Sequence, residues 1–430
     1  MSQLTLTPLP APVTKTIAIS GSKSYTNRAL IMAALADGVS RITGYSDSDD
    51  SDVLIQGLIK VGIRIEKTTQ EIVVHGNGGK FTTKNIAVNL HHAGTSSRFF
   101  LALASLIPGE IIVDGSDRLR ERPIADLTQA LLDLDVKLEF LGKPGCFPIK
   151  VFGGNNLGGK VKMRGSVSSQ FFTAMLLIAP ALKNGIEIEV LGKQISKSYI
   201  DMTVGGMQAF KVKVTNQNYK TYSVKPDQKY QACNYHVEGD ASGCSYLWAI
   251  AALTGSTIKV TNISPESTQG DVKFADLLEQ MGCKVVKNVE ESWIQITGPT
   301  QLQAITTDME LMPDTAQTLA VVAAFAQGIT TITGLATLRE KETDRLAMPV
   351  AELTKMGITA EAGPDWLKIT GGNPKTATIN TYKDHRMAMS FAVAGSKVSG
   401  MIINEPEVVK KSFTNFWEVL TELGIKSNLS

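Results

Sequence analysis

The 430-residue sequence has few cysteines, almost no net charge and no long hydrophobic run, and each absence excludes a class of protein. Its four cysteines (Cys146, Cys233, Cys244 and Cys283) form no CxxC pair and are too few for a disulfide framework, so we expect a reducing, cytoplasmic environment. The 43 Lys and Arg residues against 41 Asp and Glu give no reason to expect nucleic acid or a membrane as partner. No apolar run approaches the roughly 20 residues that span a bilayer, and the N-terminus lacks a secretion signal.

Six times along the chain, a cluster of small polar residues leads into a strongly apolar segment that ends near a glycine. The first example is 21–38, in which Gly-Ser-Lys-Ser-Tyr-Thr-Asn-Arg precedes a run of Ala, Leu, Ile and Met. The nearly constant spacing of the closing glycines indicates one structural unit used six times. We expect each glycine to cap the end of a helix. The closing glycines are Gly38, Gly109, Gly185, Gly255, Gly328 and Gly400.

Each repeat also contains an amphipathic second helix and several short strands of alternating polarity, such as 71–75 and 137–140. A helix that is apolar on every face belongs in an interior, whereas an alternating strand has one face in water. We therefore predict an α/β protein with buried helices and outer sheets, the reverse of a TIM barrel. Six units exceed one ordinary core, so two groups of three are expected. The second helices are predicted at 50–62, 122–132, 199–204, 271–278, 344–353 and 413–420.

Several of the predicted helix starts combine hydroxyl groups, glycine and cations. Lys23 and Arg28 flank the first start, Gly94-Thr-Ser-Ser-Arg98 forms the second, and 168–170 supplies Ser-Ser-Gln. A single such start is usually a solvated cap. Several of them favour binding of an anionic ligand by backbone N–H groups and cations, in a cleft between the two groups of units.

Two charged runs suggest chemistry rather than an ordinary solvated face. The run 117–124 contains three Arg residues before a helix start, as expected for contacts to carboxylate or phosphate. The run 338–346 alternates acid and base soon after Asp314, and such carboxylates suit general acid–base chemistry. We assign no role to His385 and expect no metal at the His91–His92 pair, which lacks ligand-spaced partners.

Together these motifs resemble the 5-enolpyruvylshikimate-3-phosphate synthase family, the 3-phosphoshikimate 1-carboxyvinyltransferases, over essentially the whole chain. The motifs that carry the resemblance are 21–30, Arg118-Leu-Arg-Glu-Arg-Pro-Ile, Ser168-Ser-Gln-Phe, Glu238-Gly-Asp-Ala-Ser, Lys341-Glu-Thr-Asp-Arg-Leu and Asp384-His-Arg-Met-Ala-Met. The resemblance implies a two-domain, inside-out α/β barrel, the enolpyruvyl transferase fold. One domain would comprise residues 1–20 and 238–430, the other 21–237, with the active site in the interdomain cleft.

The resemblance also implies the reaction: transfer of the enolpyruvyl group of phosphoenolpyruvate to the 5-hydroxyl of shikimate 3-phosphate, with release of phosphate through a tetrahedral intermediate. This belongs to the shikimate pathway of aromatic amino-acid biosynthesis. No cofactor and no metal would be needed, and we expect a monomer.

By motif, the implied catalytic residues are Lys23, Asp314 and Glu342. The implied shikimate 3-phosphate ligands are Lys23, Ser24, Arg28, Ser168, Ser169, Gln170, Ser196, Asp314 and Lys341. The implied phosphoenolpyruvate ligands are Lys23, Gly94, Arg118, Gln170, Arg345, Arg386 and Lys411, with Lys410 as the alternative to Lys411.

Two other functions are compatible with parts of this pattern. A UDP-N-acetylglucosamine enolpyruvyl transferase would carry a cysteine in the region before Arg122, and 115–121 has none. A non-catalytic scaffold that binds anionic sugars would not need Asp314 and Glu342, yet both are present. The sequence also departs from the resembled family at His92, where Asn is common, and at Phe99, where Pro often follows the arginine.

Overall fold

The computed structural model describes residues 2–154 and 156–429 and divides into two compact units. Unit 1 comprises Met1–Ser20 and Gly239–Ser430, and unit 2 comprises Gly21–Glu238. In this described part of the chain, no helix is both long and apolar enough to cross a membrane.

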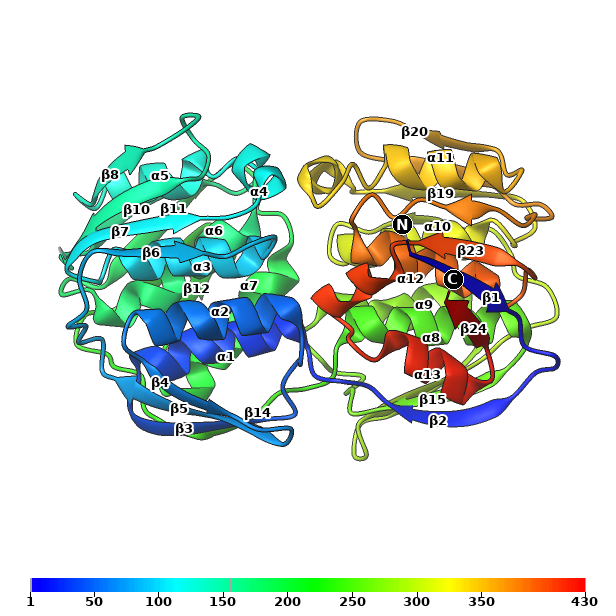
Figure 1. The fold of residues 1–430 in the computed structure, drawn as a ribbon, viewed down its shortest axis with the longest axis horizontal. Helices are drawn as coiled ribbons and strands as arrows, with labels where there is room; N and C mark the ends of the chain where they lie inside the picture. The colour runs from blue at the N-terminus through cyan, green and yellow to red at the C-terminus, as the bar shows by residue number, and fades with distance from the viewer. Residues whose placement is uncertain (1, 155, 430) are drawn as a thin grey trace. The chain divides into compact units, whose positions relative to one another are not determined.

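Unit 2 contains three apolar helices, each followed by an amphipathic one, and three four-stranded sheets (Figure 1). Its helices are α1 Lys23–Leu35, α2 Asp49–Lys60, α3 Gly94–Ala104, α4 Asp117–Glu121, α5 Ala125–Leu132, α6 Ser169–Ile178 and α7 Lys197–Ala209, with the 3-10 turn η1 Ala179–Ala181. Its strands are β3 Asp37–Thr43, β4 Arg64–Lys67, β5 Glu71–Asn77, β6 Ile86–Asn89, β7 Gly109–Asp114, β8 Lys137–Phe140, β9 Ile149–Gly153, β10 Gly159–Arg164, β11 Ile186–Leu191, β12 Thr215–Gln217, β13 Thr221–Val224 and β14 Asn234–His236.

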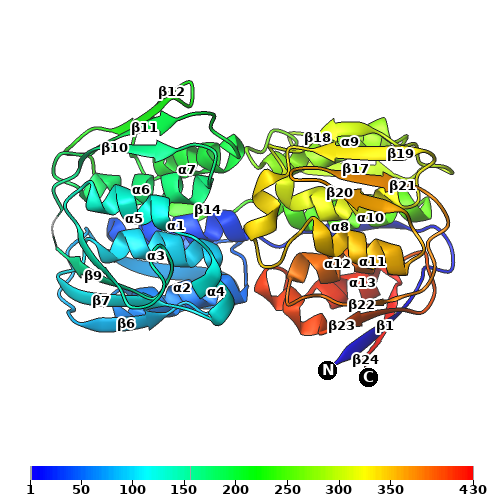
Figure 2. The same ribbon diagram turned by 90° about the horizontal axis from the view of Figure 1, so that it is seen from above.

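Unit 1 repeats this plan with the N-terminal strands added (Figure 2). Its helices are α8 Ala241–Thr254, α9 Phe274–Gln280, α10 Ala316–Ala323, α11 Ala347–Lys355, α12 His385–Gly395 and α13 Phe416–Leu423, with the 3-10 turns η2 Gly270–Lys273, η3 Pro313–Thr315, η4 Ala336–Glu340 and η5 Pro406–Lys411. Its strands are β1 Gln3–Thr7, β2 Thr14–Ala18, β15 Thr257–Thr261, β16 Lys284–Asn288, β17 Trp293–Thr297, β18 Thr306–Asp308, β19 Ile329–Thr333, β20 Ala360–Ala362, β21 Leu367–Thr370, β22 Thr378–Ile379, β23 Met401–Asn404 and β24 Lys426–Leu429.

Each of the six sheets formed by residues 2–154 and 156–429 has one parallel strand pair and two antiparallel pairs. In the sheet β6-β7-β9-β8, for example, β6 runs parallel to β7, and β9 runs antiparallel to both β7 and β8. Three sheets take a strand from a distant part of the chain: β14 joins β3, β2 joins β15, and β1 lies between β23 and β24. Figure 1 shows the blue β1 beside the red β23.

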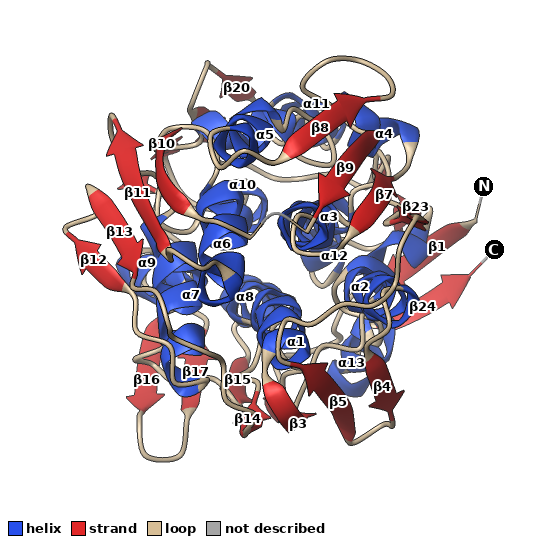
Figure 3. Ribbon diagram, turned by 90° about the vertical axis from the view of Figure 1, so that its left-hand side faces the viewer, coloured by secondary structure: helices blue, strands red, loops and turns tan. Residues whose placement is uncertain are grey.

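The apolar helices form the interior of each unit, as their sequences predict. Helices α1, α3 and α6 pack against one another in unit 2, and α8, α10 and α12 do so in unit 1. Every residue of α8 from Ala241 to Leu253 is buried. Figure 3 shows the strands of unit 2, in red, outside α1, α3 and α6. The predicted α/β architecture of six repeated units with inner helices and outer sheets is confirmed.

The predicted role of the closing glycines holds for only one of the six. Gly255 is the C-cap of α8, with φ 70°. In the other repeats the helix ends some residues earlier, so that α1 stops at Leu35 and α3 at Ala104. The glycine then lies at or just before the next strand, where the chain turns with positive φ, as at Gly109 with φ 98°. The glycine spacing therefore marks the start of a strand, because that backbone conformation favours glycine.

Candidate active site

The predicted site residues fall into two clusters, one in each unit, and both are built at the starts of the inner helices. The arginine cluster of unit 1 lies at the starts of α8, α10 and α12. The glycine-loop cluster of unit 2 lies at the starts of α1, α3 and α6. The arginine cluster consists of Ser242, Tyr246, Asp314, Lys341, Glu342, Arg345, Asp384, Arg386 and Lys411. The glycine-loop cluster consists of Lys23, Asp50, Gly94, Thr95, Arg122 and Gln170.

Arg345 holds the arginine cluster together through three carboxylates. Its side chain is 2% exposed. Its Nε donates to Asp384 Oδ2 at 2.7 Å and its Nη2 donates to Glu342 Oε2 at 2.8 Å. Its Nη1 donates to Asp314 Oδ1 at 3.2 Å. Burial by itself disfavours the charged guanidinium, but these carboxylates, Asp384 first, outweigh it and raise the pKa of Arg345 above its ordinary value.

Asp314 lies between cations that favour its ionised form. Arg386 Nη2 donates to its Oδ2 at 3.1 Å, and Lys341 Nζ lies 3.7 Å from its Oδ1. Burial alone would raise the pKa of this carboxyl. The positive charges of Arg386, Lys341 and Arg345 outweigh burial and hold the pKa of Asp314 well below its usual range.

Two further predicted residues join the cluster beside Arg345. The Glu342 carboxylate, bound to Arg345 through Oε2, has its Oε1 3.6 Å from the Nζ of Lys411. Lys411 is buried at the end of η5, whereas Lys410 is exposed. The structure thus places Lys411, and not the alternative Lys410, among the charged groups.

Asp384 supports this cluster without having been predicted to belong to it. It is fully buried, pairs with Arg345 through both carboxylate oxygens, and accepts a hydrogen bond from the backbone N–H of Arg386 as the N-cap of α12. It therefore fixes the positions of two arginines at once.

We expect Asp384→Ala to lower the free energy of unfolding by about 3 kcal/mol, because it leaves the buried Arg345 charge undercompensated. The measurement is urea denaturation followed by circular dichroism. Asp276→Ala is the matched control: Asp276 forms an exposed ion pair with Lys287, and such pairs contribute about 0–1 kcal/mol. Equal losses in the two variants would contradict a structural role for Asp384.

In unit 2, Lys23 is held at the first position of α1 by a carboxylate from the next helix. Its Nζ donates to Asp50 Oδ2 at 3.0 Å. A buried polar network fixes this pair: Asn27 donates to Ser96 Oγ at 3.2 Å, and Ser96 donates to the backbone oxygen of Asp50 at 2.9 Å. The starts of α1, α2 and α3 are thereby joined around the Lys23 ammonium.

Gly94 and Arg122 are in direct contact. A Cβ added to Gly94 would lie 2.4 Å from Arg122 Nη1, so a larger residue here would displace the guanidinium from its present position. Arg122 is 7% exposed, although it lies in the loop between α4 and α5.

A second arginine of this run, which the sequence did not single out, lies beside the glycine loop. The side chain of Arg118 is 40% exposed and its Nη1 pairs with Glu121 at 2.8 Å, one turn along the same short helix. Arg122, four residues later, is the arginine whose guanidinium lies against Gly94.

The predicted residues of the α6 start lie next to the glycine loop. Gln170 Nε2 donates to Thr95 Oγ1 at 3.2 Å, which joins the start of α6 to that of α3. Ser168 caps α6 by accepting from the backbone N–H of Gln170, and Ser169 is buried beside it. Ser196, at the N-cap position of α7, adopts the left-handed conformation with φ 50°.

Arg28 lies inside unit 2 and donates to several groups of the protein. Its Nη1 donates to the backbone oxygen of Ser24 at 2.8 Å, its Nη2 to that of Tyr199 at 2.9 Å, and its Nε to Thr203 at 2.9 Å. Burial lowers its pKa to about 10, so the guanidinium stays charged at neutral pH. Its contacts connect the chain at Ser24 to α7.

The two departures from the resembled family have different structural settings. His92 Nδ1 lies 2.7 Å from the hydroxyl of Ser116, the N-cap of α4. This contact connects the segment before Gly94 to the run 117–124, which contains Arg118 and Arg122. Phe99 is fully buried, with the Arg28 guanidinium carbon 5.5 Å from its ring centroid.

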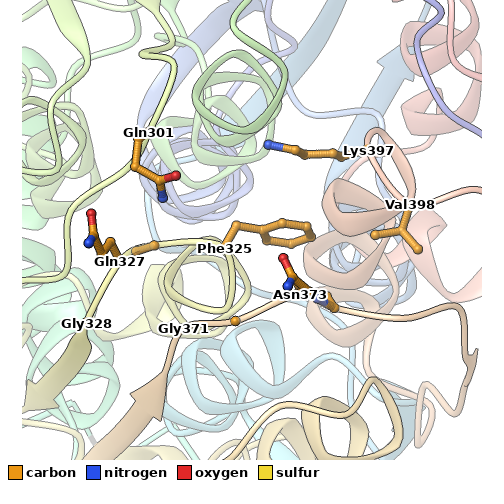
Figure 4. A pocket seen from close by; sticks show the side chains of 11 residues that line it. Gln301, Phe325, Gln327, Gly328, Gly371, Asn373, Lys397 and Val398 are labelled. Carbon is orange, nitrogen blue, oxygen red and sulfur yellow. The ribbon is translucent and has the colours of Figure 1, made fainter.

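A pocket of about 510 Å³ lies at the other end of the helices of unit 1 (Figure 4). Phe325 and Lys397, which follow the ends of α10 and α12, line it together with amide side chains such as Gln301 and Asn373. Lys397 Nζ is 5.7 Å from the Phe325 ring centroid. Because Asp314 and Arg386 lie at the starts of the same helices, this pocket is separate from the charged cluster.

Sequence reasoning missed Asp50, Arg122 and Asp384. Asp50 and Asp384 stand at helix starts, where a carboxylate is ordinarily a cap. The available signal for Arg122 was Pro123, because the residue before a proline favours an extended backbone, and here that residue is the C-cap of α4.

Comparisons with known proteins agree over nearly the full length. A family model described as EPSP synthase (3-phosphoshikimate 1-carboxyvinyltransferase) matches residues 9–420. A 3-phosphoshikimate 1-carboxyvinyltransferase of Sulfurovum sp. (strain NBC37-1) is 41% identical over 429 residues, covering 99% of this chain and 100% of the relative. The chloroplastic protein of that name from Arabidopsis thaliana is 40% identical over 442 residues, covering 98% of this chain and 84% of the relative. The solved EPSP synthase of Acinetobacter baumannii is 25% identical and superposes with a TM-score of 0.84, with both chains fully covered.

Proposed function

The chain belongs to the EPSP synthase (3-phosphoshikimate 1-carboxyvinyltransferase) family, and from this premise we propose that it transfers the enolpyruvyl group of phosphoenolpyruvate to the 5-hydroxyl of shikimate 3-phosphate. Phosphate is the second product. The main structural support for this activity is the arginine cluster. It combines cations that can bind two anionic substrates with carboxylates that can transfer protons.

The charge balance of the arginine cluster suits anionic ligands. Four cations (Lys341, Arg345, Arg386 and Lys411) face three carboxylates (Asp314, Glu342 and Asp384). The excess positive charge is concentrated at the starts of α10 and α12, where the helix dipoles also favour an anion. We propose that Arg345, Arg386 and Lys411 bind the phosphate and carboxylate of phosphoenolpyruvate.

We propose that the glycine-loop cluster of unit 2 binds the same two substrates. Arg122 replaces Arg118 in the proposed phosphoenolpyruvate set, because its guanidinium lies against Gly94. Lys23 and Gln170 contact both substrates. The proposed shikimate 3-phosphate ligands are Lys23, Ser24, Arg28, Ser168, Ser169, Gln170, Ser196, Asp314 and Lys341.

In the addition step, the 5-hydroxyl oxygen bonds to C2 of phosphoenolpyruvate while the hydroxyl proton passes to Asp314. Glu342, which enters this step as the neutral acid, gives its proton to the C3 methylene with assistance from Lys23, and the methylene becomes a methyl group in the tetrahedral intermediate. In the elimination step, that methyl group returns a proton to Glu342 and the bond from C2 to the phosphate oxygen breaks. Phosphate leaves with the proton that Asp314 accepted, so both carboxyl groups return to their starting states. The intermediate is bound by cations already in place, as expected for preorganised electrostatic stabilisation.

Substrate binding makes Asp314 a better base than it is in the unliganded site. Arg386 and Lys341 hold its pKa low, and a carboxylate with a low pKa accepts protons poorly. When the substrate anions pair with these cations, less positive charge acts on Asp314 and its pKa rises. Proton acceptance is thereby coupled to occupancy of the site.

The function is tested by phosphate release from purified protein. We expect release only when phosphoenolpyruvate and shikimate 3-phosphate are both present, and none when UDP-N-acetylglucosamine replaces shikimate 3-phosphate. Release with the UDP-sugar would assign the related transferase reaction. Calorimetric binding of shikimate 3-phosphate without release would indicate a scaffold. Either result would overturn the proposal.

A further inference from the structure

Asp271 is a buried carboxyl behind the arginine cluster, and the proposed reaction gives it no role. It is the second residue of η2, which packs against the start of α8 and against η3, the turn that contains Asp314. Asp271 is 5% exposed. The charged groups that act on it are Asp314 from η3, Arg386 from α12 and Asp240 from the start of α8.

A chain of hydrogen bonds leads from Asp271 to Asp314. Ser242 in the first turn of α8 donates its hydroxyl proton to Asp271 Oδ2. The same Ser242 oxygen accepts a hydrogen bond from Arg386 Nη2 at 3.3 Å, and Arg386 Nη2 also donates to Asp314 Oδ2 at 3.1 Å. One hydroxyl group thus separates Asp271 from the arginine that we assign to phosphoenolpyruvate.

The second oxygen of Asp271 is buried and has no hydrogen-bond partner among residues 2–154 and 156–429. An ionised carboxylate that is taken out of water normally accepts several hydrogen bonds, and one left with a single donor favours the neutral acid. Burial, and then the negative charge of Asp314, raise the pKa of Asp271 to about 7. Its surroundings therefore favour a group that gains and loses a proton near neutral pH.

We propose that Asp271 is a positioning residue that controls the binding of the anionic substrate by Arg386 through the Ser242 hydroxyl. This inference rests on the proposed function for its kinetic consequence. When Asp271 is neutral, its carboxyl O–H donates a hydrogen bond to the Ser242 hydroxyl, and no negative charge from Asp271 offsets the charge of Arg386. When Asp271 is ionised, it accepts a hydrogen bond from the Ser242 hydroxyl and adds a negative charge behind Arg386. The ionised form therefore weakens substrate binding.

The kinetic test compares the wild-type protein with Asp271→Asn, which keeps the shape and stays neutral. Between about pH 6 and pH 8, we expect the wild-type KM for phosphoenolpyruvate to rise relative to that of the variant by about fivefold, as expected when one nearby charge is added. The ratio of the two KM values is the readout, because a substrate phosphate also titrates near pH 6 and affects both proteins equally. Asp276→Asn on the neighbouring α9 is the matched control, and its ratio to wild type should not change with pH.

A second measurement does not require turnover. Because the folded-state pKa of Asp271 lies above its unfolded value, the folded protein binds more protons between the two, and stability falls as pH rises toward about 7. The Tm of Asp271→Asn relative to wild type should therefore increase from about pH 5 to pH 7 and stay constant at higher pH.

The outcomes separate this inference from the proposed function. A Tm difference that does not change over this range shows that Asp271 takes up no proton and overturns the inference. A pH-dependent Tm difference with a constant KM ratio shows that Asp271 titrates without acting on Arg386, and this also overturns it. Absence of turnover in wild type and variants together would overturn the proposed function, while the Tm comparison still tests the charge state of Asp271.

Discussion

Replacing Asp314 by asparagine should reduce kcat by about 1,000-fold, within the range typical of losing a positioned general base. Asparagine keeps the shape of the side chain and cannot accept the 5-hydroxyl proton. The affinity for shikimate 3-phosphate should change little, because Lys341 and the residues of unit 2 still bind its anionic groups. The two quantities are measured as steady-state phosphate release and as calorimetric binding of shikimate 3-phosphate.

Asp308→Asn is the control for this substitution. Asp308 is an exposed aspartate of β18 in the same unit, and it caps a turn by accepting from the backbone N–H of Glu310. Its variant should retain wild-type turnover. Turnover of Asp314→Asn within tenfold of wild type would remove Asp314 from the proton-transfer step.

Arg122→Ala should lower kcat/KM for phosphoenolpyruvate by about 100-fold to 1,000-fold, as expected for losing a charge-assisted contact from a buried guanidinium to a carboxylate or phosphate. The partner substitution Arg118→Ala should change kcat/KM by less than about threefold, because it removes an exposed pair with Glu121. Both variants are assayed at saturating shikimate 3-phosphate.

This pair of variants tests which arginine of one short run faces the substrate. A large loss for Arg118→Ala together with a small loss for Arg122→Ala would reverse our assignment. Equal and moderate losses would mean that the loop, rather than one guanidinium, determines binding.

The architecture could be predicted from the sequence because it depends on periodic, local features. A helix such as α8, apolar on every face, can only be buried, and the alternating strands beside it must lie outside. The constant repeat then gives six copies. The helix ends could not be placed as well, because a glycine with positive φ looks the same in sequence whether it caps a helix, as Gly255 does, or opens a strand, as Gly109 does.

The site could be predicted where a motif alone determines the position, as for Asp314 and Arg345, which the structure brings together. It could not be predicted where burial depends on distant residues. Arg122 lies against Gly94, which is 28 positions earlier in the chain and leaves space for its guanidinium. Asp271 resembles an ordinary helix-start acid, and its importance comes from Ser242 and Arg386, which are far from it in the chain.

The position of β1 between β23 and β24 has a consequence for how the polypeptide matures on the ribosome. Unit 2 has all its strands once β14 has been synthesised, so it can fold while translation continues. Strand β1 instead cannot pair until β23 and β24 have been synthesised, because Leu4 pairs with both Ile403 and Leu429. Until then, the segment that directly follows β1 is kept from pairing with other strands by its prolines, Pro8, Pro10 and Pro12. Strand β1 is thus made before all of unit 2 and is among the last of the described strands to reach its native place.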